Sequence, residues 1–380
     1  MNFSFTAEQQ EYGVQLRKLF EAKSPLSQIR KDAGTPCGFD SGLWHLLADQ
    51  LGVQGINIPE SYGGSGQSYL ELGVVMYESG RALSSMPLLA SVALATTALV
   101  CSGDRDAMGE WLPQLASGAI VATLATSGPH GTGDPGAPGV TASFSEGGYL
   151  LDGVTSFVIH GAVADLLLVS AVAKRGLSLF AVQADAPGMV RAALSVLDPT
   201  RPQARVTFEQ TPARLVGVEG DASLGLERTL QLAAVLLAQE QVGAAQACLD
   251  MAVGYARVRT QFGRPIGSFQ AIQHICADVF VELESARAAA DYATWAAVSA
   301  PAELPVMSSL AKAFCSDTAF LAASQNIQVH GGIGFTWEHD AHLFFKRATS
   351  MSQYLGSPAN HRELLARQVL STLALEENDE

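Results

Sequence analysis

The feature that most constrains the fold is a long apolar segment, Leu230–Tyr255, that ends in a short polar turn before a second helical pattern begins. The turn, Arg259–Ile266, contains Gly263-Arg264-Pro265, which cannot continue a helix. Arg259 and Phe262 are three residues apart, so we expect them to share one helix face. A guanidinium beside an aromatic ring suits a phosphate and a flat heterocycle. The simpler alternative is a helix-end arginine and a core phenylalanine.

The spacing of apolar residues changes twice along the chain. Residues 1–118 show helical spacing, residues 119–222 tend towards a period of two, and residues 223–380 are helical again. In the middle part, 140–144 and 149–151 predict a hairpin. The helical parts predict helices over about 69–81, 87–100, 223–259, 268–298, 305–331 and 341–351, and Ser357-Pro358 predicts the start of the last helix. The sequence therefore predicts an α+β fold, mostly α. We expect an N-terminal helical domain over 1–118, a β-barrel or sandwich domain over 119–222 and a C-terminal four-helix bundle over 223–380.

Composition and charge exclude several classes of protein. Hydrophobic residues make up 48% of the 380 residues and charged residues 16%, which is typical of a compact protein with many buried helices. A net charge of -14 argues against nucleic acid as a partner. The sequence shows no signal peptide and predicts no membrane span. Its cysteines have no metal-ligand spacing and indicate buried thiols in a reducing cytoplasm: Cys37, Cys101, Cys248, Cys276 and Cys315.

Three motifs, in this order along the chain, carry a resemblance to the acyl-CoA dehydrogenase family. They are Ile58–Gly64, then Tyr255-x-x-x-Arg259-x-x-Phe262-Gly263 with Phe269-Gln270, and then Gln328–Phe335. The resemblance covers nearly the whole chain. It implies an FAD-dependent enzyme that takes an α-proton and a β-hydride from an acyl-CoA or acyl-carrier thioester. It further implies electron transfer to an electron-transfer flavoprotein and a homodimer, tetramer or hetero-oligomer with a related chain.

The same resemblance implies where this chain contacts FAD. Leu124 and Thr126 correspond to the loop that meets the flavin ring, and Phe157 and Ile159 to a segment beside it. Ser127 departs from the family, which usually has an acidic residue there, and Ile159 replaces a threonine. The resemblance also implies that six residues reach the FAD of a neighbouring subunit: Arg259, Phe262, Gln270, Gln328, Gly331 and Gly332. The full set of predicted cofactor contacts is Leu124, Thr126, Phe157, Ile159, Arg259, Phe262, Gln270, Gln328, Gly331, Gly332 and Ser357.

The catalytic base is harder to place. Relatives carry a glutamate at one of two positions, which in this chain are Leu355 and Ala233. One carboxylate remains in the apolar helix, Glu240, and a charged residue in such surroundings needs a reason. We predict Glu240 as the base, with a structural carboxylate satisfied by an arginine or a helix cap as the alternative. Glu227 is the second candidate, although a glutamate near a helix start is favoured by the dipole alone.

The sequence leaves two other functional classes open and contains two motifs that resemble binding sites. The main alternative function is a non-catalytic partner subunit that lends FAD contacts to a related chain, for example in an enzyme for steroid side chains. An acyl-CoA oxidase is a third possibility, although those chains are usually longer. The segment 131–136 fits G-x-G-x-x-G, but Pro135, Pro138 and a strand follow it, so no Rossmann site is expected. Glu338–His342 lacks the His-Glu-x-x-His order, and we predict no metal site.

Overall fold

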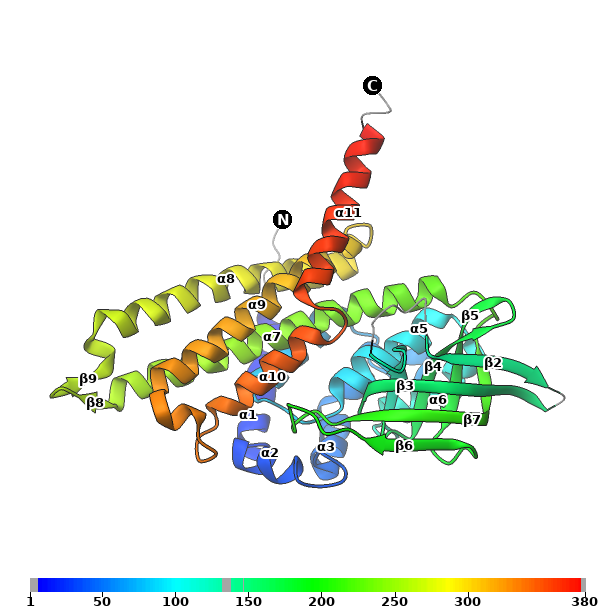
Figure 1. Ribbon diagram of the computed structural model, residues 1–380, viewed down its shortest axis with the longest axis horizontal. Coiled ribbons are helices and arrows are strands. Elements are labelled where there is room, and N and C mark those ends of the chain that lie inside the picture. The colour runs from blue at the N-terminus through cyan, green and yellow to red at the C-terminus, as the bar shows by residue number, and fades with distance from the viewer. Residues whose placement is uncertain (1–5, 132–137, 146, 377–380) are drawn as a thin grey trace. The chain divides into compact units, whose positions relative to one another are not determined.

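The computed structural model describes residues 6–131, 138–145 and 147–376 and confirms the predicted order of helices, strands and helices (Figure 1). The chain forms two compact units. Unit 1 combines Met1–Gln28, Tyr69–Ser84 and Ala234–Glu380, and unit 2 combines Ile29–Ser68 with Ser85–Ala233. The three domain boundaries expected from the sequence stay a prediction. The G-x-G-x-x-G segment lies outside the described residues except for Gly131.

The helices of unit 2 are short, and two of them, α3 and α6, begin at side-chain caps that the sequence supplies. Asp40 accepts the backbone N–H of Leu43 at 3.1 Å, and Asp104 accepts that of Ala107 at 3.0 Å. The helix expected near 87–100 is a π-helix followed by an α-helix. The elements are α2 (Leu26–Asp32), whose first residues belong to unit 1, α3 (Ser41–Leu51), η1 (Val53–Gly55), η2 (Glu60–Tyr62), η3 (Leu88–Thr96), α5 (Thr97–Ser102) and α6 (Arg105–Ala116).

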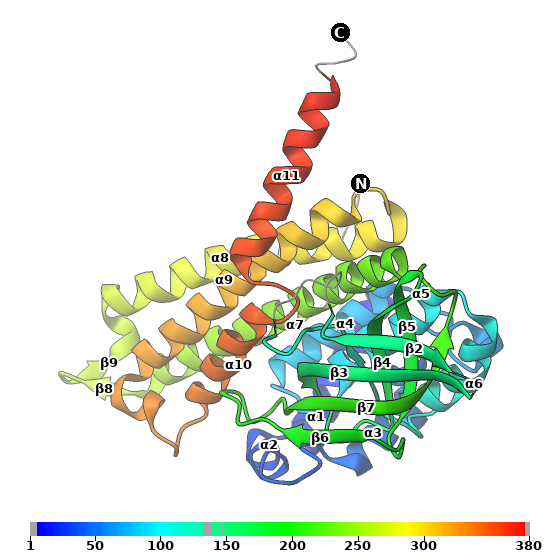
Figure 2. The ribbon, with the colours of Figure 1, turned by 45° about the vertical axis from the view of Figure 1, so that its right-hand side comes forward.

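The strands of unit 2 close into a barrel, as predicted. Strand β4 pairs with both β2 and β5, and β5 pairs with β7, so the path β4-β2-β3-β7-β5 returns to its start (Figure 2). Phe180, Phe208 and Leu167 fill the interior. The strands are β1 (Ala122–Ala125), β2 (Val140–Ser145), β3 (Gly148–Ile159), β4 (Leu166–Ala173), β5 (Gly176–Gln183), β6 (Met189–Ala193) and β7 (Gln203–Val216).

Unit 1 is the helical bundle. Helix α9 packs against α8, α10 and α11, and α1 packs against α4. The bounds match the sequence prediction closely, including a last helix that begins at Ser357-Pro358. The elements are α1 (Ala7–Lys23), α4 (Tyr69–Arg81), α7 (Ser223–Val258, whose first residues belong to unit 2), β8 (Thr260–Gln261), β9 (Arg264–Pro265), η4 (Ile266–Ser268), α8 (Gln270–Ser299), α9 (Leu304–His330), η5 (Gly331–Phe335), α10 (Ala341–Gln353) and α11 (Pro358–Glu376).

Helix α7 is the centre of this bundle. Its length and composition would allow it to cross a membrane, but 89% of its apolar window is buried inside the protein, as in a core helix. It crosses α4 at two glycines. A Cβ on Gly80 would lie 2.0 Å from the carbonyl oxygen of Glu240, and a Cβ on Gly243 would lie 1.9 Å from that of Tyr77. Glycine is therefore required at both positions for the backbones to approach this closely.

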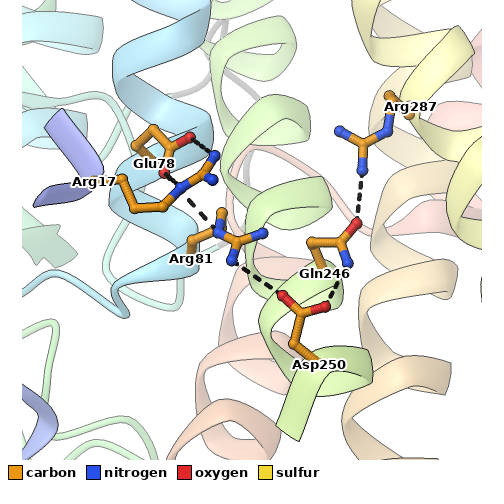
Figure 3. A network of polar contacts seen from close by, with 6 residues as sticks. All are labelled: Arg17, Glu78, Arg81, Gln246, Asp250 and Arg287. Carbon is orange, nitrogen blue, oxygen red and sulfur yellow. Dashed lines mark hydrogen bonds and ion pairs between the residues drawn. The ribbon is translucent and has the colours of Figure 1, made fainter. Parts of the chain in front are cut away.

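A chain of polar side chains links α1, α4, α7 and α8 at this crossing (Figure 3). Arg17 donates to both carboxylate oxygens of Glu78, at 3.0 and 2.6 Å. Arg81 bonds Asp250 at 3.0 Å, and Gln246 joins Asp250 to Arg287. Glu78 is not among the residues predicted from the sequence, although its place among buried residues of α4 resembles that of Glu240 on α7.

Candidate functional site

The turn after α7 differs from the sequence prediction. Arg259 and Phe262 do not share a helix face, because α7 ends at Val258 and residues 260–265 form a hairpin of β8 and β9. Phe262 and Gly263 form the two-residue loop, with φ angles of 53° and 78°. Positive φ at both positions is typical of a type I′ turn. The turn holds the Phe262 side chain 91% exposed, so it is not the core phenylalanine of the simpler alternative either.

The base of this hairpin and the end of α9 border one hollow of about 370 Å³. Its lining is mainly apolar and aromatic and includes the guanidinium of Arg259 and the His330 ring: Tyr255, Arg259, Gln261, Phe262, Ile266, Phe269, Ile272, Val329 and His330. Tyr255 stacks on His330 with ring centroids 4.3 Å apart. The structure thus brings together two motifs that lie some way apart in the sequence.

The predicted contacts around this hollow are accessible. Gln270, at the start of α8, and Gln328, in the last turn of α9, are exposed. Gly331 has a φ of 64°, and a Cβ added to either Gly331 or Gly332 would meet no atom within 4 Å. The glycine at 331 is therefore explained by backbone conformation, and the space beside both glycines is open to a ligand.

The predicted contacts in unit 2 differ in exposure. Leu124 and Ile159 are buried, Thr126 is partly buried, and Phe157 is 52% exposed. Phe157 has a φ of 58° and lies where the pairing of β3 with β7 shifts between Thr155 and Val158. This bulge turns its ring out of the barrel. Ser127, the departure from the family pattern, donates to the carbonyl oxygen of Ser156.

Glu240 lies in the interior of unit 1. Its side chain is 0% exposed, and Oε1 accepts a hydrogen bond from Nη1 of Arg347 at 2.9 Å. The Arg347 side chain is 1% exposed, and its Nη2 donates to the carbonyl oxygen of Ser84 at 3.2 Å. This pair on α7 and α10 is the arrangement that the sequence analysis held as the alternative to a catalytic base. Arg347 was missed, and its only sequence signal is an arginine among apolar residues of a short helix.

The other positions considered for the base lie in α7 and in the turn between α10 and α11. Glu227 is exposed near the start of α7 and accepts a hydrogen bond from Gln231 at 3.1 Å. Ala233 is fully buried in α7. Leu355 lies in the turn between α10 and α11 with a φ of 59°. Ser357, a predicted cofactor contact, caps α11 by accepting the N–H of Asn360 at 3.3 Å.

The histidines near residue 339 form ring contacts. The His339 ring lies 4.3 Å from that of His330, and its Nδ1 accepts the backbone N–H of Ala341 at 3.1 Å. Burial lowers the pKa of His330, and the neighbouring His339 lowers it further. Within residues 6–131, 138–145 and 147–376, no group of three His, Cys, Asp or Glu side chains is arranged to hold a metal ion.

Two described families match parts of this chain. Residues 6–119 match the family described as "Acyl-CoA dehydrogenase, N-terminal domain", and residues 226–370 match "Acyl-CoA dehydrogenase, C-terminal domain". The acyl-CoA dehydrogenase IpdE2 of Mycobacterium tuberculosis is 35% identical over 340 residues, which cover 89% of each chain.

Two solved structures have the same fold over almost their full length. A chain of a variant of the Tcur3481-Tcur3483 steroid ACAD has a TM-score of 0.88 at 30% identity, covering 97% of this chain and 99% of that one. A chain of the ChsE4-ChsE5 complex from Mycobacterium tuberculosis has a TM-score of 0.88 at 29% identity, with the same coverage.

Proposed function

Because the chain belongs to the acyl-CoA dehydrogenase family, we propose that it is one of two unlike subunits of an FAD-dependent acyl-CoA dehydrogenase, and that the related partner chain supplies the catalytic base. The comparisons confirm the predicted family and its oxidoreductase class. The proposal is that this chain and its partner have different roles, with the catalytic base on the partner. It rests above all on one observation, the buried ion pair of Glu240 with Arg347.

The ion pair supports a structural role for Glu240. A base that removes the α-proton of a thioester must come within hydrogen-bonding distance of the substrate. The Glu240 side chain is 0% exposed, and an arginine that is itself buried occupies one of its oxygens. Removing one partner of such a pair leaves an uncompensated buried charge. The two positions where relatives carry their base hold Leu355 and Ala233, which cannot accept a proton.

The residues around the hollow in unit 1 fit a dinucleotide cofactor. Arg259 would pair with a phosphate, and the exposed Phe262 ring would cover a flat heterocycle. The open space beside Gly331 and Gly332 would let the same ligand approach their backbone closely. In unit 2, the exposed ring of Phe157 would pack on the flavin. Bound FAD would supply the acceptor for the β-hydride.

We infer the substrate, the assembly and the electron acceptor from the similar proteins. The substrate would be a coenzyme A thioester, and the steroid ACAD among the structural neighbours favours a bulky acyl group. The ChsE4-ChsE5 complex favours assembly with a related chain rather than with a second copy. Electrons would pass to an electron-transfer flavoprotein, and we place the protein in the cytoplasm.

One experiment separates this proposal from a self-sufficient enzyme. The tagged chain is produced alone and is also recovered from the organism that encodes it, with co-purifying chains identified by mass spectrometry. Each sample is titrated anaerobically with a panel of acyl-CoA thioesters while flavin absorbance is followed. We expect flavin and bleaching only where an identified acyl-CoA dehydrogenase chain is present. Bleaching of the chain alone, abolished by Glu240→Gln in a variant that stays folded, would overturn the proposal and establish Glu240 as the base.

A further inference from the structure

The turn between α10 and α11, residues 354–357, has a backbone that needs support from its surroundings. Leu355 and Gly356 have φ angles of 59° and 101°, and a leucine is unfavourable in this left-handed region. A Cβ on Gly356 would lie 3.1 Å from Nε2 of His361, so glycine also makes room for that ring. One histidine and one lysine bond the carbonyl oxygens of Leu355 and Gly356, and Asn360 bonds Ser357.

Lys312 reaches the turn from α9. Its side chain is 0% exposed, and its Nζ lies 3.0 Å from Oγ of Ser316, 3.3 Å from the carbonyl oxygen of Ser352 and 3.1 Å from that of Gly356. An ammonium has three donors, and each has an acceptor here. The Ser352 carbonyl belongs to the last turn of α10, where carbonyl groups lack partners within the helix. Lys312 therefore fastens the end of α10 to the turn that follows it.

His361 holds the same turn from α11. Its Nε2 lies 2.9 Å from the carbonyl oxygen of Leu355, so Nε2 carries the proton and donates. Its Nδ1 is buried and has no hydrogen-bond partner among the described residues. A proton added to Nδ1 would therefore create a buried donor without an acceptor. It would also place a second positive charge close to Lys312.

The other charged and titratable groups around the pair do not neutralise it. Asp317, one turn along α9, forms an ion pair with Arg362 of α11, and both side chains are about half exposed. The buried thiol of Cys315 points to the carbonyl oxygen of Ala286 on α8. From α7, the uncharged Gln241 donates to Ser316 at 2.9 Å. Among the described residues, Lys312 makes no ion pair within 4.0 Å.

We propose that Lys312 and His361 form a proton-operated latch on the 354–357 turn. Lys312 is the positioning residue that holds the turn closed, and protonation of His361 releases it. The latch goes beyond the proposed function. It concerns whether residues 354–357 are closed or open, and it does not depend on which subunit supplies the catalytic base.

The direction of the pH dependence follows from burial. Burial, with the nearby Lys312 charge, lowers the pKa of His361 from its ordinary 6.5 to about 4, and burial lowers that of Lys312 from 10.5 to about 7. The open turn, where His361 meets water, binds more protons than the closed one at pH values between 4 and 6.5. Opening therefore becomes easier as the pH falls through this range. Lys312 has the same effect at higher pH: the open turn binds more protons than the closed one between pH 10.5 and about 7, so opening also becomes easier as the pH falls through that range.

Amide hydrogen exchange of the full chain, read by mass spectrometry over residues 352–361, tests the latch. Rates are corrected for the intrinsic pH dependence of exchange, and peptides from the buried part of α7 that lies in unit 1 report opening of the whole unit. Between pH 6.5 and about 4 we expect the opening constant of the turn to rise by up to about tenfold per pH unit. His361→Gln keeps an N–H donor but does not titrate, so its opening constant should be independent of pH in this range.

Two further variants distinguish opening of the 354–357 turn from a general weakening of the contacts between α9 and α11. Lys312→Met should raise the opening constant of the turn at least tenfold at neutral pH. Asp317→Asn, which breaks the exposed pair between the same helices, should behave as the wild type. A pH-independent opening constant in the wild type, or the wild-type slope in His361→Gln, would refute the latch even if Lys312→Met did not fold. If Ser357 contacts FAD, acid release would also loosen the flavin; that consequence rests on the proposed function, whereas the exchange measurement does not.

Discussion

Two buried carboxylates of unit 1, Glu240 and Glu78, differ in what surrounds their partners. The Glu240 side chain is 0% exposed and its partner Arg347 is 1% exposed, so both charges are withdrawn from water. The Glu78 side chain is 3% exposed, but Arg17 and Arg81 are 39% and 23% exposed. Through Arg81, Glu78 is connected to Asp250, whose side chain is half exposed to solvent (Figure 3). Burial of a carboxylate alone does not show how much the fold depends on it.

We infer that the exposure of the arginine determines how much stability is lost when its carboxylate is removed. An arginine that reaches water can hydrate once its carboxylate is gone, whereas a fully buried arginine cannot. By this reasoning Glu240 and Arg347 act as one structural unit between α7 and α10. Glu78 stabilises the crossing of α1 and α4 in a way that should tolerate substitution better.

The largest effect is expected for Glu240→Met. It leaves Arg347 buried without its carboxylate and should lower the free energy of unfolding by about 3–5 kcal/mol. Urea unfolding followed by circular dichroism measures it. The matched control is the double variant Glu240→Met/Arg347→Met, which removes both charges and should recover most of the loss. A double variant no more stable than the single one would show that the two side chains do not act as a pair.

A smaller effect is expected for Glu78→Gln. Arg17 loses a charged acceptor but keeps a neutral one and remains partly hydrated, so the loss should be about 1–2 kcal/mol. The same unfolding experiment on Arg17→Gln and on the double variant Glu78→Gln/Arg17→Gln gives the coupling energy between the two side chains. If Glu78→Gln cost as much as Glu240→Met, the exposure of the arginine would not be what separates the two sites.

The smallest effect is expected at the exposed end of this chain of contacts. Asp250→Ala removes the contacts to Arg81 and Gln246, and the loss should stay below about 1 kcal/mol because the Asp250 side chain is 50% exposed. Raising the salt concentration should shrink this difference further, while the loss in Glu240→Met should persist. A salt-independent loss at Asp250 would mean that it serves the bundle by packing rather than by charge.

Local patterns allowed much of the fold to be predicted. The bounds of α4 follow from apolar spacing, and Ser357-Pro358 marks the start of α11, because caps and periodicity are properties of neighbouring residues. The hairpin at Phe262 was not predicted. Helical spacing between Arg259 and Phe262 holds only while the helix continues, and two positive φ angles end it. The predicted FAD contacts stay predictions; the structure brings those at Arg259 and Phe262 to one hollow.

Patterns of neighbouring residues were enough to predict the order of helices and strands, the barrel between helical parts and the family, since each depends on short-range spacing or on motifs. Which side chains meet could be learned only from the folded chain. Arg347 lies 107 residues from Glu240, and Lys312 lies 44 residues from Gly356. Such partners depend on how helices pack, and a buried charge looks the same in the sequence whether it serves catalysis or holds two helices together.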